Sequence, residues 1–404
     1  MNANPTGVTE GDWSGLVVIQ GANNWDGVRF HDRQLAENLA EFAPVLYVDP
    51  PMSYLSARRR ADHQAALEGP RLRQVAPRLA RLTPVVLPGM ERRGMAHVTS
   101  FLMARMIRRA VRRLGGDVAA LVETSTTVPV LGRCGEARKV YWAQDDFVGS
   151  AELLGLDGER IAAGERRLLG IADTIVAANP SVADSLRERG HDPVLIPYGC
   201  DIAMFRETPR TEPAADVDLP GPIAGFMGHL GDRIELSLLE AVADRGISLL
   251  LVGPRHPRFA IERMAALLDR PNVQWVGAKE FEELPAYLRT MDVGLVPYNF
   301  SAFNIGSFPL KMLEYLGSGR PVVATDLPAV RWLDSEHIRV ASEPDTFADA
   351  VAEALKSPGT DADFAARQEF AAGHSWRHRA EAFATAVLRE PPREPAARRT
   401  GAAG

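Results

Sequence analysis

The residues whose types and spacing best suit chemistry lie around Lys311 and Glu314. Pro309 is typical of the first turn of a helix and Gly317 of a helix end, so Lys311 falls near a predicted helix start. Free N–H groups and the helix dipole favour an anion there, and Lys311 adds positive charge. Glu314 lies one turn later, where it can accept hydrogen bonds from ribose hydroxyls. The pattern predicts a diphosphate site; the alternative is a solvated lysine and a surface ion pair.

Four further residues flank this segment. Ser307 ends the loop before the helix, where its hydroxyl or N–H can reach a phosphate, and Leu310 directly precedes the lysine. Tyr298 and Met227 lie at the ends of apolar runs, which is where parallel sheets contact their ligands. We predict that all four bind the ligand, although Tyr298 and Met227 equally fit simple packing in a core.

A second candidate group is the pair Asp145 and Asp146, which follows the apolar run 140–143. A carboxylate at a strand end can take the proton from a hydroxyl that attacks an electrophilic carbon. Two adjacent aspartates can also hold a divalent metal through oxygen, or cap the helix that follows. We predict Asp145 as the general base, and no metal site.

The long polar loop after the first apolar run offers a further set of groups. His31 is the second candidate for the base, and Trp25 suits stacking on a sugar face. Hydroxyls or a phosphate can be bound by Asp26, Arg29 and Arg33. The alternative is that His31 and its neighbour cap the next helix while the arginines lie on the surface.

Short apolar runs that alternate with amphipathic segments must position these groups. Such runs are typical of strands that are buried on both faces of a parallel sheet. In the first half they cover residues 16–19, 45–48, 84–87, 118–122, 140–143, 174–177 and 194–197. In the second half they cover residues 223–227, 248–252, 273–276, 293–296 and 321–324. Helices are expected between them, including 34–42, 95–114, 236–243, 281–291 and one long final helix over 361–388.

Two such arrays predict an α/β fold with two Rossmann-like domains. We place the N-terminal domain at 14–207, a Pro-rich acidic linker at 208–221 and the C-terminal domain at 222–365. Residues 366–389 are expected to form a C-terminal helix that packs back on the N-terminal domain. Residues 390–404 are expected to form a disordered tail, because they are rich in Pro, Arg, Ala and Gly.

The composition narrows the class of protein. The 404 residues, 46% hydrophobic and 24% charged, are typical of two globular domains. A net charge of −6 argues against nucleic acid as the partner. Cys134 and Cys200 have no metal-like spacing, and no apolar run reaches the roughly 18 residues that span a bilayer. We expect a metal-independent, cytoplasmic protein, with any membrane contact peripheral and at the inner face.

Residues 95–114 predict an amphipathic helix with two distinct faces. One face carries Arg105, Arg108, Arg109, Arg112 and Arg113. Two interpretations remain open. The helix is an ordinary one whose apolar face belongs to the core, or its arginines also contact anionic lipid or a lipid-linked diphosphate.

The segment 309–325 resembles the donor-site helix of GT-B glycosyltransferases, with the pattern Pro-Leu-Lys-x-x-Glu-Tyr-Leu-x-x-Gly-x-Pro-Val-Val-Ala-Thr. Residues 196–201 with Phe205 are similar to the family's segment at the end of the N-terminal domain. Residues 225–229 match the glycine-rich start of its second domain. Within this family, residues 140–145 resemble bacterial exopolysaccharide enzymes, namely the xanthan glucuronosyltransferase and the teichuronic-acid-type transferases.

The resemblance implies a GT-B enzyme whose two domains face each other across a cleft. Its donor would be a nucleotide-diphosphate sugar, either a UDP- or a GDP-sugar with UDP favoured, and no separate cofactor would be needed. Its acceptor would be a glycan, a lipid-linked molecule or a small molecule, in polysaccharide biosynthesis. By position, Asp145 takes the place of the catalytic base and Lys311 that of the donor lysine, while Tyr298 and Met227 lie near the donor.

Three positions depart from the family pattern. Gly306 stands where many retaining enzymes have a glutamate. His229 takes the place of a donor-site arginine and Ile234 that of a lysine, for which the neighbouring Arg233 can substitute. These departures favour an inverting mechanism with a carboxylate base. They also leave two alternatives, a non-catalytic sugar-nucleotide-binding protein and a sugar-nucleotide epimerase.

Overall fold

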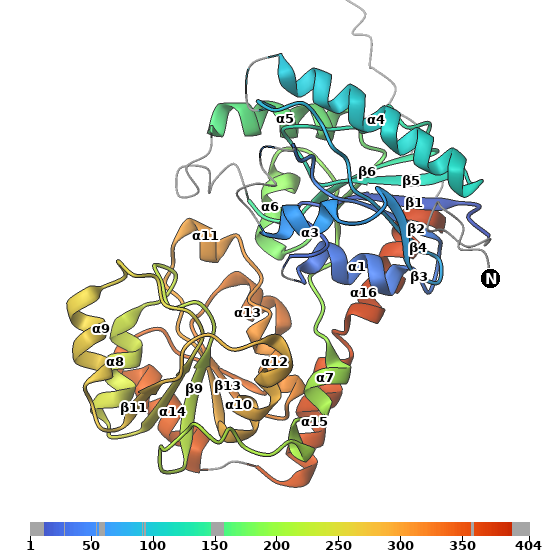
Figure 1. Cartoon of the computed structure of the whole chain (residues 1–404). Coiled ribbons are helices and arrows are strands. Elements are labelled where there is room, and N and C mark those ends of the chain that lie inside the picture. The colour runs from blue at the N-terminus through green and yellow to red at the C-terminus, as the bar shows by residue number, and fades with distance from the viewer. Residues whose placement is uncertain are drawn as a thin grey trace, which may run out of the picture. The chain divides into compact units, whose positions relative to one another are not determined.

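The protein contains two compact α/β units, which the computed structural model in Figure 1 describes for residues 12–27, 29–53, 55, 61–90, 92, 94–146, 157–356 and 359–389. The first unit runs to Ala178, takes in Ala183–Ile196 and resumes at Ala380. The second unit consists of Asn179–Val182 and Pro197–Arg379. The chain therefore leaves the first unit, builds the second and returns.

Eight strands of the described residues form the sheet of the first unit, in the order β3-β4-β2-β1-β5-β6-β7-β8. They are β1 (Leu16–Gln20), β2 (Val45–Val48), β3 (Leu72–Ala76), β4 (Leu79–Leu82), β5 (Val118–Glu123), β6 (Arg138–Ala143), β7 (Thr174–Ala177) and β8 (Val194–Leu195). Neighbouring strands run parallel except β3 and β4, which form an antiparallel hairpin at one edge. The central strands β1 and β2 are buried along their whole length, as a sheet covered on both faces requires.

Helices cover both faces of this sheet: α4 and α5 lie on one side of it in Figure 1, and α1 and α16 on the other. The helices are α1 (His31–Leu39), α3 (Ala61–Leu67), α4 (Met95–Leu114), α5 (Gly158–Ile171), α6 (Pro180–Glu188) and α16 (Trp376–Ala384). A π-helical turn, Thr385–Arg389, follows α16. Among the described residues, the structure holds no helix whose length and apolar character would let it cross a membrane.

The sheet of the second unit is parallel throughout the described residues, in the order β11-β10-β9-β12-β13-β14. Its strands are β9 (Ile223–Met227), β10 (Ser248–Val252), β11 (Val273–Trp275), β12 (Val293–Val296), β13 (Val322–Ala324) and β14 (Ile338–Val340). Its helices are α7 (Ile202–Arg206), α8 (Leu236–Asp244), α9 (Ile261–Leu268), α10 (Leu284–Thr290), α11 (Ala302–Ile305), α12 (Lys311–Gly317), α13 (Pro328–Leu333), α14 (Pro344–Lys356) and α15 (Asp361–Ala372).

Helix α12 packs unusually close to this sheet. A Cβ atom on Gly294 of β12 would lie 2.2 Å from the ring of Tyr315, so only glycine lets the ring lie against the strand. The Tyr315 hydroxyl accepts a hydrogen bond of 2.8 Å from the backbone N–H of Met227 at the end of β9. These contacts fix Tyr315 of α12 between β12 and the carboxyl end of β9.

Most predicted strands are present, but two expectations are wrong and one strand was missed. Residues 84–87 form no strand; Val85 makes only an isolated bridge with Met52, and the hairpin of β3 and β4 forms this side of the sheet instead. The final helix predicted over 361–388 is divided into α15, α16 and the π turn. The helix is interrupted at His374 and Ser375, because the backbone there pairs with Cys200. Strand β14 was not predicted.

Candidate active site

The site in the second unit begins with Lys311, the first residue of α12. Its side chain crosses the backbone of Gly228: a Cβ atom there would lie 2.3 Å from the Lys311 Cε. Gly253, which follows β10, packs against Gly228 in turn. A Cβ atom on Gly253 would lie 2.1 Å from the backbone oxygen of Gly228. Both glycines have positive φ angles, +155° and +132°. The two glycines thus leave room for the Lys311 side chain to pass at the carboxyl edge of the sheet.

Glu314 lies one helical turn beyond Lys311 and is partly buried. Burial raises the pKa of its carboxyl group, and the nearby Lys311 charge opposes that rise. The Cys200 thiol is buried close to the same carboxylate; burial and then this charge raise its pKa well above the usual value. Glu314 can therefore accept hydrogen bonds from hydroxyl groups, whereas Cys200 is an inert core residue.

A second cation, Arg233, is fixed near the end of β12 by four contacts. Its guanidinium group lies 4.7 Å from the ring centres of both Tyr298 and Phe303. Its Nε donates to the Asn304 Oδ1 at 2.7 Å, and its Nη2 donates to the Ser307 Oγ at 3.1 Å. Tyr298 and Ser307 are both buried, so in this structure they hold Arg233 in place.

The remaining predicted donor residues are placed differently. Met227 is buried and ends β9, where its backbone N–H is taken by Tyr315. Leu310 is partly buried and is the N-cap residue of α12, where its apolar side chain cannot cap the helix. His229 is exposed just after Gly228, and its ring packs edge-on against His256 with 6.3 Å between ring centres. His256, which follows β10, was not predicted.

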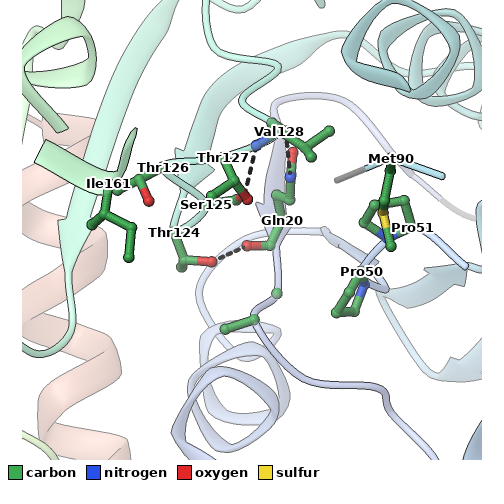
Figure 2. A pocket seen from close by; sticks show the side chains of 12 residues that line it. Gln20, Pro50, Pro51, Met90, Thr124, Ser125, Thr126, Thr127, Val128 and Ile161 are labelled. Carbon is green, nitrogen blue, oxygen red and sulfur yellow. Dashed lines mark hydrogen bonds between the residues drawn. The ribbon is translucent and has the colours of Figure 1, made fainter. Parts of the chain in front are cut away.

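In the first unit, a hollow of about 330 Å³ lies at the carboxyl edge of the sheet. Figure 2 shows its walls, which come from the segments after β1, β2 and β5 together with Met90 and Ile161. The lining residues after the strands are Gln20, Gly21, Ala22, Pro50, Pro51, Thr124, Ser125, Thr126, Thr127 and Val128. The Gln20 side-chain amide donates to the backbone oxygen of Val128 at 3.0 Å. The Thr124 hydroxyl donates to the backbone oxygen of Gln20 at 2.8 Å.

Glu123, which ends β5, anchors the loop that lines this hollow. It is fully buried and accepts hydrogen bonds from the backbone N–H groups of Ser125 at 2.9 Å and Val130 at 2.6 Å. Burial raises the pKa of its carboxyl group to about 8, against the lowering effect of these hydrogen bonds. Glu123 therefore shapes the loop and carries a proton over much of the neutral range.

Asp145 and Asp146 follow β6 at the same edge, because β6 runs parallel to β5. Both are partly buried, and neither lines the hollow. The alternative that this pair caps a following helix concerns residues 147–156, which lie outside the described part of the chain. No group of three or more His, Cys, Asp or Glu side chains suited to a metal ion is found among the described residues.

His31 begins α1, beside the ring of Phe30. Burial lowers the pKa of its imidazole to about 4, although the adjacent Asp32 raises it. Asp32 itself is buried, and accepts hydrogen bonds from the Asn23 backbone at 2.9 Å and the Tyr47 hydroxyl at 2.8 Å. An imidazole with so low a pKa is neutral at pH 7 but a weak base.

A buried charge network holds the rest of the first loop. Arg81 of β4 donates to Asp49 at 2.7 Å and to Asp26 at 2.6 Å. Asp49 also accepts the backbone N–H of Trp25 at 2.9 Å, and Arg33 lies 4.6 Å from the centre of the Trp25 ring. Asp26 and Trp25 therefore make structural contacts here. Arg29 likewise pairs with Glu37 at 2.7 Å.

Comparison with known proteins agrees with this architecture. Residues 222–357 match the family described as glycosyl transferases group 1. The second unit is a group 1 glycosyltransferase domain. A relative in Bacillus subtilis (strain 168), TuaH, assigned to teichuronic acid biosynthesis as a glycosyltransferase, is 27% identical over 210 residues, 50% of this chain. That alignment covers 53% of TuaH, about half of its length.

The glycosyltransferase domain and the first unit together have the GT-B fold. Sucrose-phosphate synthase from Thermosynechococcus elongatus superposes with a TM-score of 0.66 at 18% identity, over 92% of this chain and 98% of its own. Anabaena HepE in complex with UDP superposes with a TM-score of 0.65 at 14% identity, over 93% of this chain and 100% of its own. At these identities the likeness concerns the fold alone.

Several residues that line or support the first unit were not predicted from the sequence. Thr124–Thr127 directly follow an apolar strand, which is where parallel sheets contact their ligands. Glu123 ends the same strand and looked like an ordinary boundary residue. Arg81 is the one charged residue of the short strand β4, and nothing in the sequence indicated its burial between Asp26 and Asp49.

Proposed function

We propose that the protein transfers a sugar from a nucleotide-diphosphate sugar, preferably a UDP-sugar, to a hydroxyl of a glycan, lipid-linked or small-molecule acceptor. The observation that carries this proposal is the placement of Lys311 across Gly228, at the carboxyl edge of a group 1 glycosyltransferase domain. An ammonium group held at a glycine turn can neutralise a diphosphate leaving group. HepE, which shares the fold, is known in complex with UDP.

The donor would be held by side chains of the second unit. Lys311 would contact the diphosphate. Arg233, which Asn304 holds in place, and the exposed His229 would supply further N–H groups to it. Glu314 would accept hydrogen bonds from the ribose hydroxyls. Leu310, Met227, Tyr298 and Ser307 would shape the same edge. In this proposal the donor is a co-substrate, and no metal or separate cofactor takes part.

The acceptor would occupy the hollow of the first unit, where Thr124, Ser125 and Gln20 offer hydrogen bonds beside the apolar Pro50 and Met90. Asp145 would accept the proton of the attacking hydroxyl, and the reaction would invert the anomeric carbon. His31 remains the second candidate for the base. Its low pKa makes it the weaker one.

A thermal-shift panel tests the donor site first. UDP, GDP, ADP, TDP and CMP are added to the wild-type protein, to Lys311→Ala and to Lys356→Ala, which removes an exposed lysine at the end of α14. One diphosphate, expected to be UDP, should stabilise the wild type by about 2.7 kcal/mol at a hundredfold excess over its dissociation constant. Lys311→Ala should lose this stabilisation and Lys356→Ala should keep it.

Other results would contradict the proposal in distinct ways. If no nucleotide raises the melting temperature, the donor site is wrong. If a diphosphate binds through Lys311 but no donor sugar turns over with any acceptor, a non-catalytic sugar-nucleotide-binding protein replaces the enzyme. Gly306 and His229, which depart from the pattern of the family, are the observations that favour this second candidate.

A further inference from the structure

The solvent face of α4 combines strong positive charge with exposed apolar side chains. All five arginines predicted for one face are exposed: Arg105, Arg108, Arg109, Arg112 and Arg113. The 20 residues of α4 include no aspartate or glutamate that could pair with them along the helix. Val98 and Phe101 belong to the same helix and are 42% and 53% exposed. At the spacing 98, 101, 105, 108 and 112 these side chains follow one stripe of the helix.

Two hollows adjoin this stripe. The first, here named the arginine hollow, has a volume of about 330 Å³ and is lined by Arg105, Arg109, Arg112 and Arg113. The second, the apolar groove, has a volume of about 160 Å³ and lies between α4 and the β3–β4 edge. It is lined by Arg71, Leu72, Leu82, Thr83, Val85, Met106, Arg109, Ala110 and Arg113. Arg109 and Arg113 therefore belong to both hollows.

This juxtaposition fits a molecule with an anionic head and an apolar stem. Guanidinium groups bind phosphate through paired N–H donors, and several of them surround one space in the arginine hollow. Leu72, Val85 and Met106 in the apolar groove favour an alkyl chain over water. The arginines, Val98 and Phe101 of α4 are exposed, so a membrane surface can reach them.

We propose that the arginine hollow and the apolar groove bind an anionic phospholipid, with its headgroup phosphate among the arginines and the start of its chain in the groove. The protein then binds the membrane surface through α4, with Phe101 and Val98 in the interfacial layer. A nucleic acid would use the arginines, but it has no use for the groove or for the exposed Phe101. This site is separate from the donor site, so it stands or falls independently of the proposed activity.

Vesicle flotation of the full chain tests the site. The vesicles are phosphatidylcholine alone, or equal parts of phosphatidylcholine and phosphatidylglycerol. The test variant is Arg109→Gln with Arg113→Gln, since these two arginines line both hollows. The matched control is Arg166→Gln with Arg167→Gln, an exposed pair on α5 in the same unit that removes the same charge. Met106→Gln tests the groove without changing the charge.

The wild type should float with the anionic vesicles and stay behind with the neutral ones. The test variant should partition about thirtyfold more weakly, because each arginine near an anionic surface strengthens binding by about fivefold. Met106→Gln should bind the anionic vesicles more weakly than the wild type. The control variant on α5 should bind them as strongly as the wild type. All variants should keep the wild-type circular dichroism and the UDP-induced thermal shift.

Five results would overturn the proposal. The first three are no flotation of the wild type with anionic vesicles, an equal loss in the α5 pair, and wild-type binding by Met106→Gln. The fourth is a thermal shift by inorganic phosphate or glycerol phosphate that needs Arg109 and Arg113 while vesicles do not bind, which would indicate a site for a free phosphate. Binding of an RNA oligonucleotide with the same dependence, and none to vesicles, would replace lipid by nucleic acid.

Discussion

Single side chains in both units owe their positions to close backbone contacts. Lys311 crosses Gly228 because that residue has no Cβ, and the Tyr47 hydroxyl passes Gly21 for the same reason, since a Cβ there would lie 2.1 Å away. Arg233 is held between two rings and two hydrogen bonds. Cationic groups fixed in this way lose little side-chain entropy when an anion binds.

The candidate base is tested by Asp145→Asn, which keeps the shape of the side chain and removes its basicity. We expect the rate of nucleoside diphosphate release from the donor, in the presence of acceptor, to fall by about 10²- to 10⁴-fold. The UDP-induced thermal shift should stay unchanged, because the proposed donor contacts are on other residues. Asp146→Asn is the matched control and should keep most of the activity. Near-normal turnover in Asp145→Asn would transfer the role to His31 or another group.

At the scale of elements, the loop after β5 depends on one buried carboxyl group. Glu123 ties that loop to the sheet and has a pKa of about 8, against an ordinary value of 4.5. Between these two values the folded protein holds a proton that the unfolded chain has lost. The raised pKa of Glu123 therefore contributes stability that is fully present below about pH 4.5 and is lost as the pH rises to about 8.

Chemical denaturation across this range checks the effect with Glu123→Gln, whose side chain does not ionise. The free energy of unfolding of the wild type should fall relative to the variant, by an amount on the order of a few kcal/mol between pH 5 and 9. Glu159→Gln, which changes an exposed carboxyl on α5, should follow the wild type. Parallel curves for the wild type and Glu123→Gln would show that the carboxyl ionises normally.

Strands buried on both faces could be predicted from the sequence because their apolar runs are continuous, as in Val45–Val48 and Ser248–Val252. The β3–β4 hairpin could not, because an edge pair with interspersed arginines lacks such a run. Lys311 and Glu314 were recognisable by their local pattern. The hollow of the first unit was not, because it gathers loops after three strands that lie far apart in the sequence.

At the scale of the whole molecule, the last described segment belongs to the first unit. Phe383 is buried, and its ring lies 5.6 Å from that of Trp142 on β6, the strand that leads to Asp145. This contact joins residues that are separated by most of the chain. The support of the candidate base therefore comes partly from residues that follow the entire second unit.

Phe383→Ala should destabilise the first unit by about 3–5 kcal/mol, the usual effect of removing a buried phenyl ring. Hydrogen exchange followed by mass spectrometry should show faster exchange in β6 and unchanged exchange in β9. Phe347→Ala is the matched variant, since it removes a fully buried ring from α14 and should speed exchange in the second unit instead. Equal acceleration in both units by Phe383→Ala would contradict the assignment of this segment.

The return of the chain to the first unit also has a consequence for biosynthesis. A ribosome completes residues 1–178 early, yet the segment from Ala380 that finishes this unit emerges only after all of the second unit has been made. During that interval the apolar surface around Trp142 lacks the ring of Phe383 that covers it. The nascent first unit is thus the part that a chaperone would have to protect until the last residues of the second unit have been made.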